Sequence, residues 1–290
     1  MDITTFLISV YCMIDDWMGD RRLRARGPQP RLSDAEVLTI EVVGEFLGID
    51  TDSGLYRYFR RHFGEWFPDL MGIHRTTFLR QAANLWRVKR ELWQDLVKQV
   101  PQDGLITVID SFPVPVCRFA RAPRCQGFKG QAAFGHDEVA RQTYYGFRAH
   151  LCIHWPGVIS DLRVTPANVH DTVAAETLLS DCTGWALGDR NYWKPALQEA
   201  LQERGLFLLT PFRSAKREPF RFPIQLTHMR YRIETVIGQL VDRFHIKKVW
   251  ARDAWHLNSR WMRKLLSHTI AVLFCTFAEL PPLQLASLIH

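Results

Sequence analysis

The chain has 290 residues, enough for a sizeable hydrophobic core and for more than one domain, and its composition is that of a soluble globular protein. Lysine and arginine total 37 against 30 aspartate and glutamate residues, which gives a net charge of +7 and a pI near 9.2. This moderate excess suits a polyanionic partner such as nucleic acid without proving one.

The cysteines and the apolar runs exclude several classes of protein. The 6 cysteines are scattered without a Cys-x-x-Cys pair, so the sequence indicates neither a disulfide framework nor a zinc ribbon. Cys117, Cys125 and His136 remain an alternative set of metal ligands, although their spacing matches no common zinc pattern. The apolar run 269–278 is too short to span a bilayer, and the N-terminus carries no basic segment, so we expect a cytoplasmic protein.

Residues 1–100 are expected to form an all-α N-terminal domain. Ser33, followed three residues later by Glu36, is a capping box, which predicts the start of a helix whose apolar stripe runs to Leu47. Apolar residues at helical intervals predict a second helix over 54–62 and a third over about 76–100.

A basic connector, residues 21–31, precedes Ser33 and combines five arginines with two prolines. It is consistent either with an arm that lies on a phosphate backbone or with a solvated linker. Together with the helices of residues 1–100 it forms the candidate DNA-binding domain.

After Pro101 the periodicity becomes that of strands. An apolar run, 105–109, predicts a buried strand that ends at Asp110, and the alternating stretch 144–155 predicts a strand with one covered face. Pro156-Gly157 predicts a turn into an antiparallel strand over 158–165. The remaining predicted elements are a helix at 171–180, a strand at 185–188, a helix at 193–204, a strand at 206–210 and a long helix that includes 229–244.

This order of elements predicts an α/β (α+β) catalytic domain over residues 101–250, with a mixed sheet flanked by helices. The order is similar to that of the ribonuclease H-like fold. The expected architecture is therefore a ribonuclease H-like sheet preceded by the all-α N-terminal domain. Residues 251–290, with a helix from about His256, are expected to pack on the catalytic domain.

Three acidic residues lie at matching positions in these elements. Asp110 ends the first strand, Asp189 ends the strand at 185–188, and Glu234 lies in the long helix. An acid at the C-terminal end of a buried strand reaches the rim of the sheet, where its charge can meet water or a metal ion. Three converging carboxylates, with water and phosphate oxygens, suffice for two Mg²⁺ or Mn²⁺ ions. The pattern predicts a two-metal site for phosphoryl transfer.

The surroundings of Glu234 suit such a role. It lies at the edge of the apolar stripe of its helix, one turn after Arg230 and one turn before Gly238. Gly238 lowers helix propensity by about 1 kcal/mol relative to alanine, which is reasonable if something must approach Glu234 closely. Arg230 either orients Glu234 or contacts a phosphate, and the alternative is a surface ion pair.

Five segments form an ordered series of motifs: 109–113 (IDSFP), 145–150 (YGFRAH), 165–171 (TPANVHD), 187–192 (LGDRNY) and 232–235 (RIET). In this order they resemble the blocks of the DDE transposases of bacterial insertion sequences, most closely the insertion sequence nine-eight-two family. The similarity covers the chain from about residue 30 to 275. It implies that Asp110, Asp189 and Glu234 bind two divalent ions and that the reaction is an in-line displacement at a DNA phosphodiester.

The long helix departs from the family pattern at two positions. Related transposases carry a Tyr-x-x-Arg-x-x-x-Glu motif with a lysine seven residues after the glutamate. Arg230 matches this motif, but Thr227 replaces the tyrosine and Val241 the lysine. Lys247 and Lys248 are nearby candidates for the missing DNA contact.

Other residues are candidates for binding DNA or assisting the site. The segment 117–129 interleaves basic and aromatic residues and is either a DNA-gripping loop or a disordered, solvated one. Arg148 and His150 share the polar face of their strand, where they either border the site or are partly solvated. Asp171 is an auxiliary acid or, as we expect, a helix N-cap. The candidate DNA-binding or auxiliary residues are Arg230, Arg148, His150, Arg118, Arg121, Arg124, Lys129, Lys247 and Lys248.

The resemblance implies a transposase that cleaves the ends of an insertion sequence and transfers them to target DNA. One alternative is a metal-dependent nuclease of the same fold that cleaves without strand transfer. Another is a DNA-binding protein that has lost catalysis, and the three acids argue against it. The implied partners are double-stranded DNA, as terminal inverted repeats and as target, and a second copy of the chain in the DNA complex. The implied location is the bacterial nucleoid.

Overall fold

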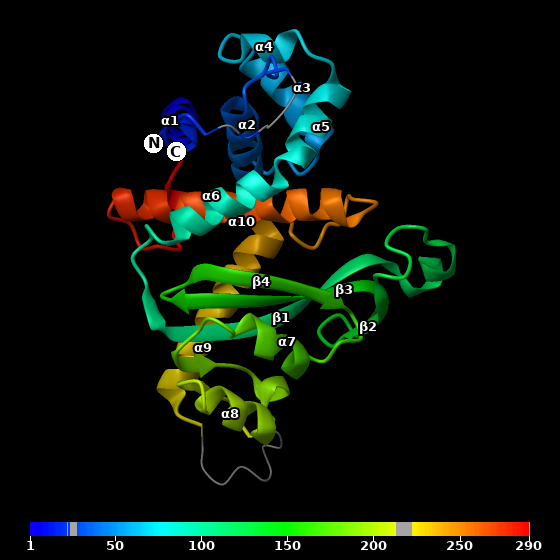
Figure 1. Ribbon diagram of the computed structural model, residues 1–290, viewed down its shortest axis with the longest axis vertical. Coiled ribbons are helices and arrows are strands. Elements are labelled where there is room, and N and C mark those ends of the chain that lie inside the picture. The colour runs from blue at the N-terminus through cyan, green and yellow to red at the C-terminus, as the bar shows by residue number, and fades with distance from the viewer. Residues whose placement is uncertain (22, 24–27, 213–221, 290) are drawn as a thin grey trace. The chain divides into compact units, whose positions relative to one another are not determined.

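The structure is a computed structural model that describes residues 1–21, 23, 28–212 and 222–289 (Figure 1). The chain divides into two compact units. The helical unit comprises Met1–Val100, Asp242–Ile246 and Trp250–His290, and the sheet unit comprises Pro101–Val241 and Lys247–Val249. Most of the predicted basic connector, including Arg22, Arg24 and Arg26, lies outside the described residues.

The helical unit confirms the predicted capping box and corrects the third predicted helix. Ser33 Oγ accepts a hydrogen bond from Glu36 N at 3.1 Å, and Glu36 Oε2 accepts one from Ser33 N at 2.7 Å. The predicted helix over 76–100 is two helices, because the chain leaves helical geometry at the buried residue Leu85 (ψ 8°). The helices are α1 (Ile3–Met18), α2 (Asp34–Phe46), α3 (Asp52–His62), α4 (Pro68–Met71), α5 (Arg75–Asn84), α6 (Trp86–Val97) and α10 (Ala254–Phe277).

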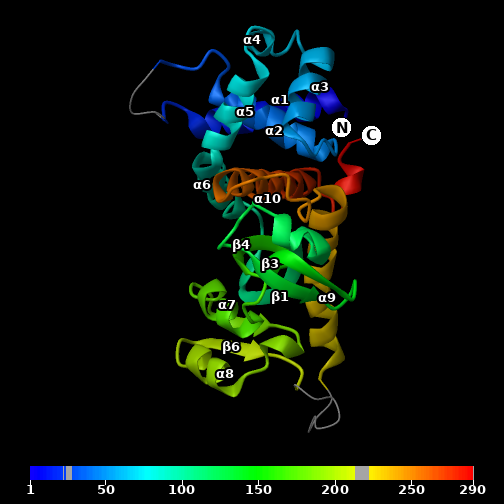
Figure 2. The same ribbon diagram turned by 90° about the vertical axis from the view of Figure 1, so that its right-hand side faces the viewer.

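The long helix α10 is the centre of the helical unit. It is buried along most of its length, from Leu257 to Cys275, and it packs against α6, α2 and α5. Figures 1 and 2 both show α10 lying beside α6. The prediction that residues 251–290 pack on the catalytic domain therefore needs correction: α10 supplies the core of the N-terminal helices, since its apolar side chains cover more than one face.

Buried ion pairs join α2 to α6 and to α10. Lys89 Nζ lies 2.6 Å from Glu41 Oε2, and Arg263 Nε lies 2.6 Å from Glu45 Oε1. Lys264 Nζ lies 2.9 Å from the other oxygen of Glu45. All five side chains are almost fully buried. A buried charge without a partner is strongly destabilising, so these pairs restrict how the helices can be aligned.

The sheet unit is built on six strands in one mixed sheet, which confirms the predicted α/β class. The strands are β1 (Asp103–Arg118), β2 (Ala133–Asp137), β3 (Gln142–Trp155), β4 (Val158–Pro166), β5 (Gly184–Leu187) and β6 (Leu206–Leu209). Their order is β2-β3-β1-β5-β6, with β4 also paired to β3. The chain reverses between β1 and β3, whereas β5 and β6 run parallel to β1. The turn at Pro156-Gly157 joins the predicted hairpin β3–β4.

In the part of the sheet unit that the structure describes, the sheet is covered by the helices α7 (Asp171–Leu178), α8 (Pro195–Gln202) and α9 (Ile224–Gly238). Ile109 and Cys152 share a core cluster with α7 residues, and α9 packs on β1. Figure 2 shows α9 on the other side of the sheet from α7 and α8. Because side chains alternate along a strand, Ile109 faces α7 and Asp110 faces the α9 side.

The prediction that β3 has only one covered face is wrong. His150 and Cys152, on its supposedly polar face, are fully buried, as are Ala149 and Leu151 on the other. The helix α7 packs against β3 and covers the polar face. Among the described residues, no helix combines the length and apolar composition needed to cross a bilayer.

Candidate active site

The sequence predicts that Asp110 ends the first strand. In the structure Asp110 lies inside β1. β1 continues to Arg118 because its second half stays paired with β3, with Asp110 opposite Leu151. The parallel strand β5, however, pairs with β1 only as far as Val108, which lies opposite Leu187. Asp110 thus follows the last β1–β5 pair, and its position is still the rim where the parallel strands end.

Asp189 follows the end of β5 by two residues. Its carboxylate accepts hydrogen bonds from the backbone N of Asn191 at 2.9 Å and from Asn191 Nδ2 at 3.0 Å, which caps the short 3₁₀ helix η2 (Arg190–Tyr192). These hydrogen bonds hold the Asp189 carboxylate against η2. Since β1 and β5 are neighbours, Asp110 and Asp189 both follow the end of the β1–β5 pairing, each two residues past the last pair.

Burial disfavours the charged form of both aspartates. Burial raises the pKa of Asp110 from its ordinary value of 3.8 to about 7, and the negative charge of Asp189 adds to this rise. The hydrogen bond from Ser111 N and the charge of Arg230 act in the opposite direction. Burial also raises the pKa of Asp189, against the hydrogen bond from Asn191. Such a pair of carboxylates is stabilised by a cation placed between them.

Glu234 is held apart from this pair by a local contact. Its side chain on α9 is 50% exposed, and its Oε1 lies 3.3 Å from the Arg230 guanidinium one turn earlier. Among the described residues, no group of three or more histidine, cysteine, aspartate or glutamate side chains is arranged to hold a metal ion. The three predicted acids therefore do not form a preassembled metal site in this structure. A Cβ added at Gly238 would meet nothing within 4 Å, so none of the residues that the structure describes makes the close approach that this glycine had suggested.

Arg230 links the three acids electrostatically. It pairs with Glu234, and its charge also lowers the pKa of Asp110 and of Asp189 against the effect of burial. The ion pair fits both the predicted orienting role of Arg230 and the alternative of an ion pair without a catalytic role. Its side chain is 19% exposed, so the pair is not a fully solvated surface contact.

A polar layer, formed by the half-buried Ser111 and Arg148 and the buried His150 and Asp171, lies on the α7 side of the site. The Arg148 guanidinium is 3.3 Å from Asp171 Oδ2 and donates to Ser111 Oγ at 3.2 Å. His150 Nδ1 is 3.5 Å from Asp171 Oδ1. Ser111 directly follows Asp110, so the layer supports the strand segment that carries the acid. Sequence reasoning missed Ser111, although it stands in the motif 109–113.

The layer corrects two predictions. His150 is fully buried, and burial lowers its pKa to about 4, so it is a neutral internal residue and neither a DNA ligand nor a solvated strand residue. Asp171 is not the N-cap of α7, because His170 caps the helix by accepting a hydrogen bond from Thr172 N at 3.2 Å. The charge of Asp171 instead contributes to the raised pKa of Asp189.

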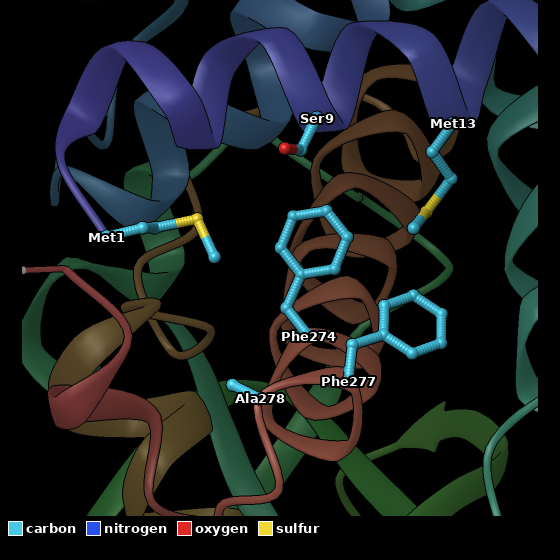
Figure 3. A pocket seen from close by; sticks show the side chains of 6 residues that line it. All are labelled: Met1, Ser9, Met13, Phe274, Phe277 and Ala278. Atoms are coloured by element: carbon cyan, nitrogen blue, oxygen red, sulfur yellow. The ribbon is translucent and has the colours of Figure 1, made fainter.

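A polar cavity of about 260 Å³ borders the polar layer. Arg148 and Asp171 line it from β3 and α7, and Asn191, whose amide binds Asp189, lines it from η2. Asn191 was also missed, although it lies in the motif 187–192. By contrast, a cavity of about 350 Å³ in the helical unit is lined by Met1, Ser9, Met13, Phe274, Phe277 and Ala278 (Figure 3). Since these side chains include no acid or base, that cavity offers no chemistry for catalysis.

The structure describes the whole of the predicted basic segment 117–129. It begins in the last residues of β1 and continues as the 3₁₀ helix η1 (Phe119–Arg124). Arg118, Arg121, Arg124 and Lys129 are all exposed on it. Lys248 is exposed and Lys247 is half-buried. Cys117 and Cys125 lie together, but within the described residues they form no three-ligand set with His136, so the zinc alternative is not supported.

Comparison with known proteins gives one match. A family model described as a transposase DDE domain matches residues 101–253, slightly more than half of the chain, and the matched range includes Asp110, Asp189 and Glu234. No curated protein and no solved structure matches the chain. The predicted recognition is thereby confirmed at the level of the DDE transposases. The chain belongs to the family defined by the transposase DDE domain.

Proposed function

We propose that the protein cleaves the DNA ends of an insertion sequence and joins them to target DNA by a two-metal DDE mechanism, on a ribonuclease H-like catalytic domain. One observation supports this most strongly. In a chain with a transposase DDE domain, Asp110 and Asp189 each lie two residues past the last paired residues of the neighbouring strands β1 and β5, and the pKa of each is raised. Membership of the insertion sequence nine-eight-two family is part of the proposal and depends on the five ordered motifs.

The donor set fits divalent cations. Two carboxylates whose charged form is disfavoured by burial need a counter-charge, and carboxylate oxygens are preferred ligands of Mg²⁺ and Mn²⁺. Asp110 and Asp189 would hold the ions, and Glu234 would complete the set after leaving Arg230. Bound there, the metal ions supply charge stabilisation at the phosphate and lower the pKa of the attacking water or 3′-hydroxyl.

The chain's own residues account for the remaining tasks. Arg230, released from Glu234, is placed to bind a DNA phosphate as a charge-assisted donor. Arg148 and Asp171 keep Ser111, and with it the segment of Asp110, in place. The exposed basic residues of segment 117–129, with Lys247 and Lys248, bind the DNA backbone. The helices of residues 1–100 recognise the terminal repeats, and a homodimer brings two DNA ends together.

A joining assay tests this function. The full chain is incubated with Mg²⁺, a target plasmid and a labelled duplex taken from the DNA that flanks its gene. Labelled plasmid supports a transposase, whereas cleaved duplex without joined product supports the nuclease alternative. A folded protein without any metal-dependent activity would instead support a DNA-binding protein that has lost catalysis.

Variants then assign the residues. Asp110→Ala, Asp189→Ala and Glu234→Ala are each expected to abolish cleavage and to leave DNA binding largely in place. Glu176→Ala, at an exposed position on α7, is the matched control and should cleave normally. Normal cleavage by any one of the three variants would remove that residue from the proposed site.

A further inference from the structure

Two stretches of the helical unit contain basic residues and no acidic ones. Residues 70–90, which include α5 and the start of α6, contain four arginines and one lysine without any aspartate or glutamate. Residues 53–64, which include most of α3, contain three arginines and are also free of acids. The helices α3 and α5 pack against each other (Figure 1). Helices of this charge are complementary to a polyanion.

The inner face of α5 is fixed by hydrogen bonds to its neighbours. The buried Gln81 Nε2 donates to the carbonyl oxygen of Leu32 and to Oδ1 of Asp34, each at 2.8 Å. The hydroxyl of Tyr56, on α3, donates to the carbonyl oxygen of Ile73 at 2.8 Å, in the turn that leads into α5. Because one face of α5 is held in this way, its other face is presented in a defined orientation.

The outer face of α5 is polar. Thr76, Arg80 and Asn84 are exposed and follow one another at intervals of four residues, so they share this face. Among the residues that the structure describes, Arg80 and Asn84 find no hydrogen-bond or ion-pair partner. Their guanidinium and amide groups are therefore available to a ligand from outside the chain.

We propose that α5 lies in the major groove of double-stranded DNA and that Arg80 and Asn84 determine which base pairs are bound. The proposal rests on the proposed function, in which the helices of residues 1–100 recognise the terminal repeats. The major groove of B-DNA admits an α-helix. Arg80 can donate two hydrogen bonds to O6 and N7 of a guanine, and Asn84 can pair with N6 and N7 of an adenine. Four residues of a helix span about 6 Å, so the two bases lie about two base pairs apart.

Exposed arginines outside this face suit the DNA backbone. Arg75, in the first turn of α5, and Arg61, near the end of α3, are exposed and have no partner among the described residues. Contacts to phosphates fix the position of a protein on the duplex but carry no sequence information. The two groups of residues therefore differ in effect: Arg80 and Asn84 set the sequence preference, whereas Arg75 and Arg61 raise the affinity for every sequence.

Selection from a pool of random duplex DNA tests the proposal on the full chain. With EDTA present to prevent metal-dependent cleavage, the wild type should enrich a motif with a guanine and an adenine about two base pairs apart. Arg80→Lys keeps the charge but lacks the planar fork of arginine, so the preference for that guanine should fall about 10–100-fold while the affinity for random DNA is unchanged. Asn84→Ala should lower the preference for the adenine by a similar factor.

Two further variants separate base recognition from charge. Arg75→Gln should weaken binding to every sequence by the same factor and leave the enriched motif unchanged. Lys98→Gln, at an exposed ion pair on α6, is the charge-matched control and should change neither the affinity nor the motif. The proposal would be overturned if the wild type enriched no motif, or if the Arg80→Lys and Asn84→Ala proteins enriched the wild-type motif.

Cleavage assays distinguish a failure of this proposal from a failure of the proposed function. If the variants lose the motif but the wild type shows no metal-dependent cleavage, the proposed function fails and the role of α5 stands. If the wild type cleaves and joins DNA but Arg80→Lys and Asn84→Ala keep its motif, the role of α5 fails and the proposed active site stands.

Discussion

Replacing Asp110 with asparagine should stabilise the metal-free protein at neutral pH, although it removes an acid from the proposed site. The pKa of Asp110 is raised from 3.8 to about 7 by burial and by the charge of Asp189. Between these two pH values the native carboxyl keeps a proton that the unfolded chain has released. The free energy of unfolding of the wild type therefore falls as the pH rises from 3.8 to 7 and is level above pH 7.

The expected size of the effect comes from this pKa. A rise from 3.8 to about 7 corresponds to about 4 kcal/mol between the ionised and neutral forms. The asparagine side chain of the Asp110→Asn variant would carry no charge and would keep the oxygen that accepts from Ser111 N, 2.7 Å away in the wild type. At pH 8 the Asp110→Asn variant should exceed the wild type by up to about 4 kcal/mol, and at pH 5 by less than about 2 kcal/mol.

Urea denaturation in the presence of EDTA measures this difference at both pH values. Glu176→Gln, at an exposed position on α7, is the control and should change the free energy of unfolding by less than about 0.5 kcal/mol. Adding Mg²⁺ at about 100 times its dissociation constant should then stabilise the wild type by about 2.7 kcal/mol and the variant by less. The reasoning would be refuted if the Asp110→Asn protein were less stable than the wild type at pH 8, or if the difference in their free energies of unfolding were the same at pH 5 and pH 8.

Three further substitutions test other parts of the account. Asp171→Asn removes the counter-charge of Arg148 and leaves the cap of α7 by His170 in place. Cleavage should fall about 10–100-fold with unchanged DNA affinity. An unchanged cleavage rate would show that the polar layer does not support the site. Lys89→Met takes from Glu41 its closest cation and should lower the free energy of unfolding by about 3 kcal/mol in urea, whereas Lys98→Met, at an exposed pair, should change it by less than about 1 kcal/mol. Similar values for the two lysine variants would contradict this. Arg121→Gln should weaken binding to every DNA sequence and should lower the salt dependence of the binding constant by about one phosphate contact, as measured by fluorescence anisotropy. An unchanged salt dependence would show that Arg121 is not part of the DNA interface.

Most of the elements could be predicted from patterns among residues that are close together in the sequence. The capping box at Ser33 involves residues three apart, and the apolar run before Asp110 is contiguous. The turn at Pro156-Gly157 is equally local. Because Asp189 follows such a run, its place after the end of β5 could be predicted from the sequence alone, whereas Asp110 lies inside β1.

Contacts between residues far apart in the sequence explain most of the differences between the predicted and the observed structure. β1 continues past Asp110 only because β3 pairs with it, a pairing that no run of residues in β1 announces. β2 has five residues and alternates between half-buried and exposed positions, so it carried no apolar signal. The helix α10 has apolar side chains on several faces, and its pattern did not identify α6 as its partner. The pairing of Arg148 with Asp171 joins residues 23 apart on different elements.

Glu234 shows a different limit of prediction from the sequence. Its position on the long helix was predicted, and α9 does carry it, but its side chain pairs with Arg230 one turn away. That contact is short-range and available without any ligand. A carboxylate needed at a metal site can therefore rest on a neighbouring arginine until a cation competes for it.

The most direct test of the central claim is a crystal structure of the full chain with Mn²⁺ and a DNA end, with the metal located by its anomalous scattering. The account predicts Mn²⁺ bound by carboxylate oxygens of Asp110 and Asp189, with Glu234 turned from Arg230 toward the metal. Manganese bound elsewhere, with Asp110 and Asp189 free of metal beside the DNA, would contradict it.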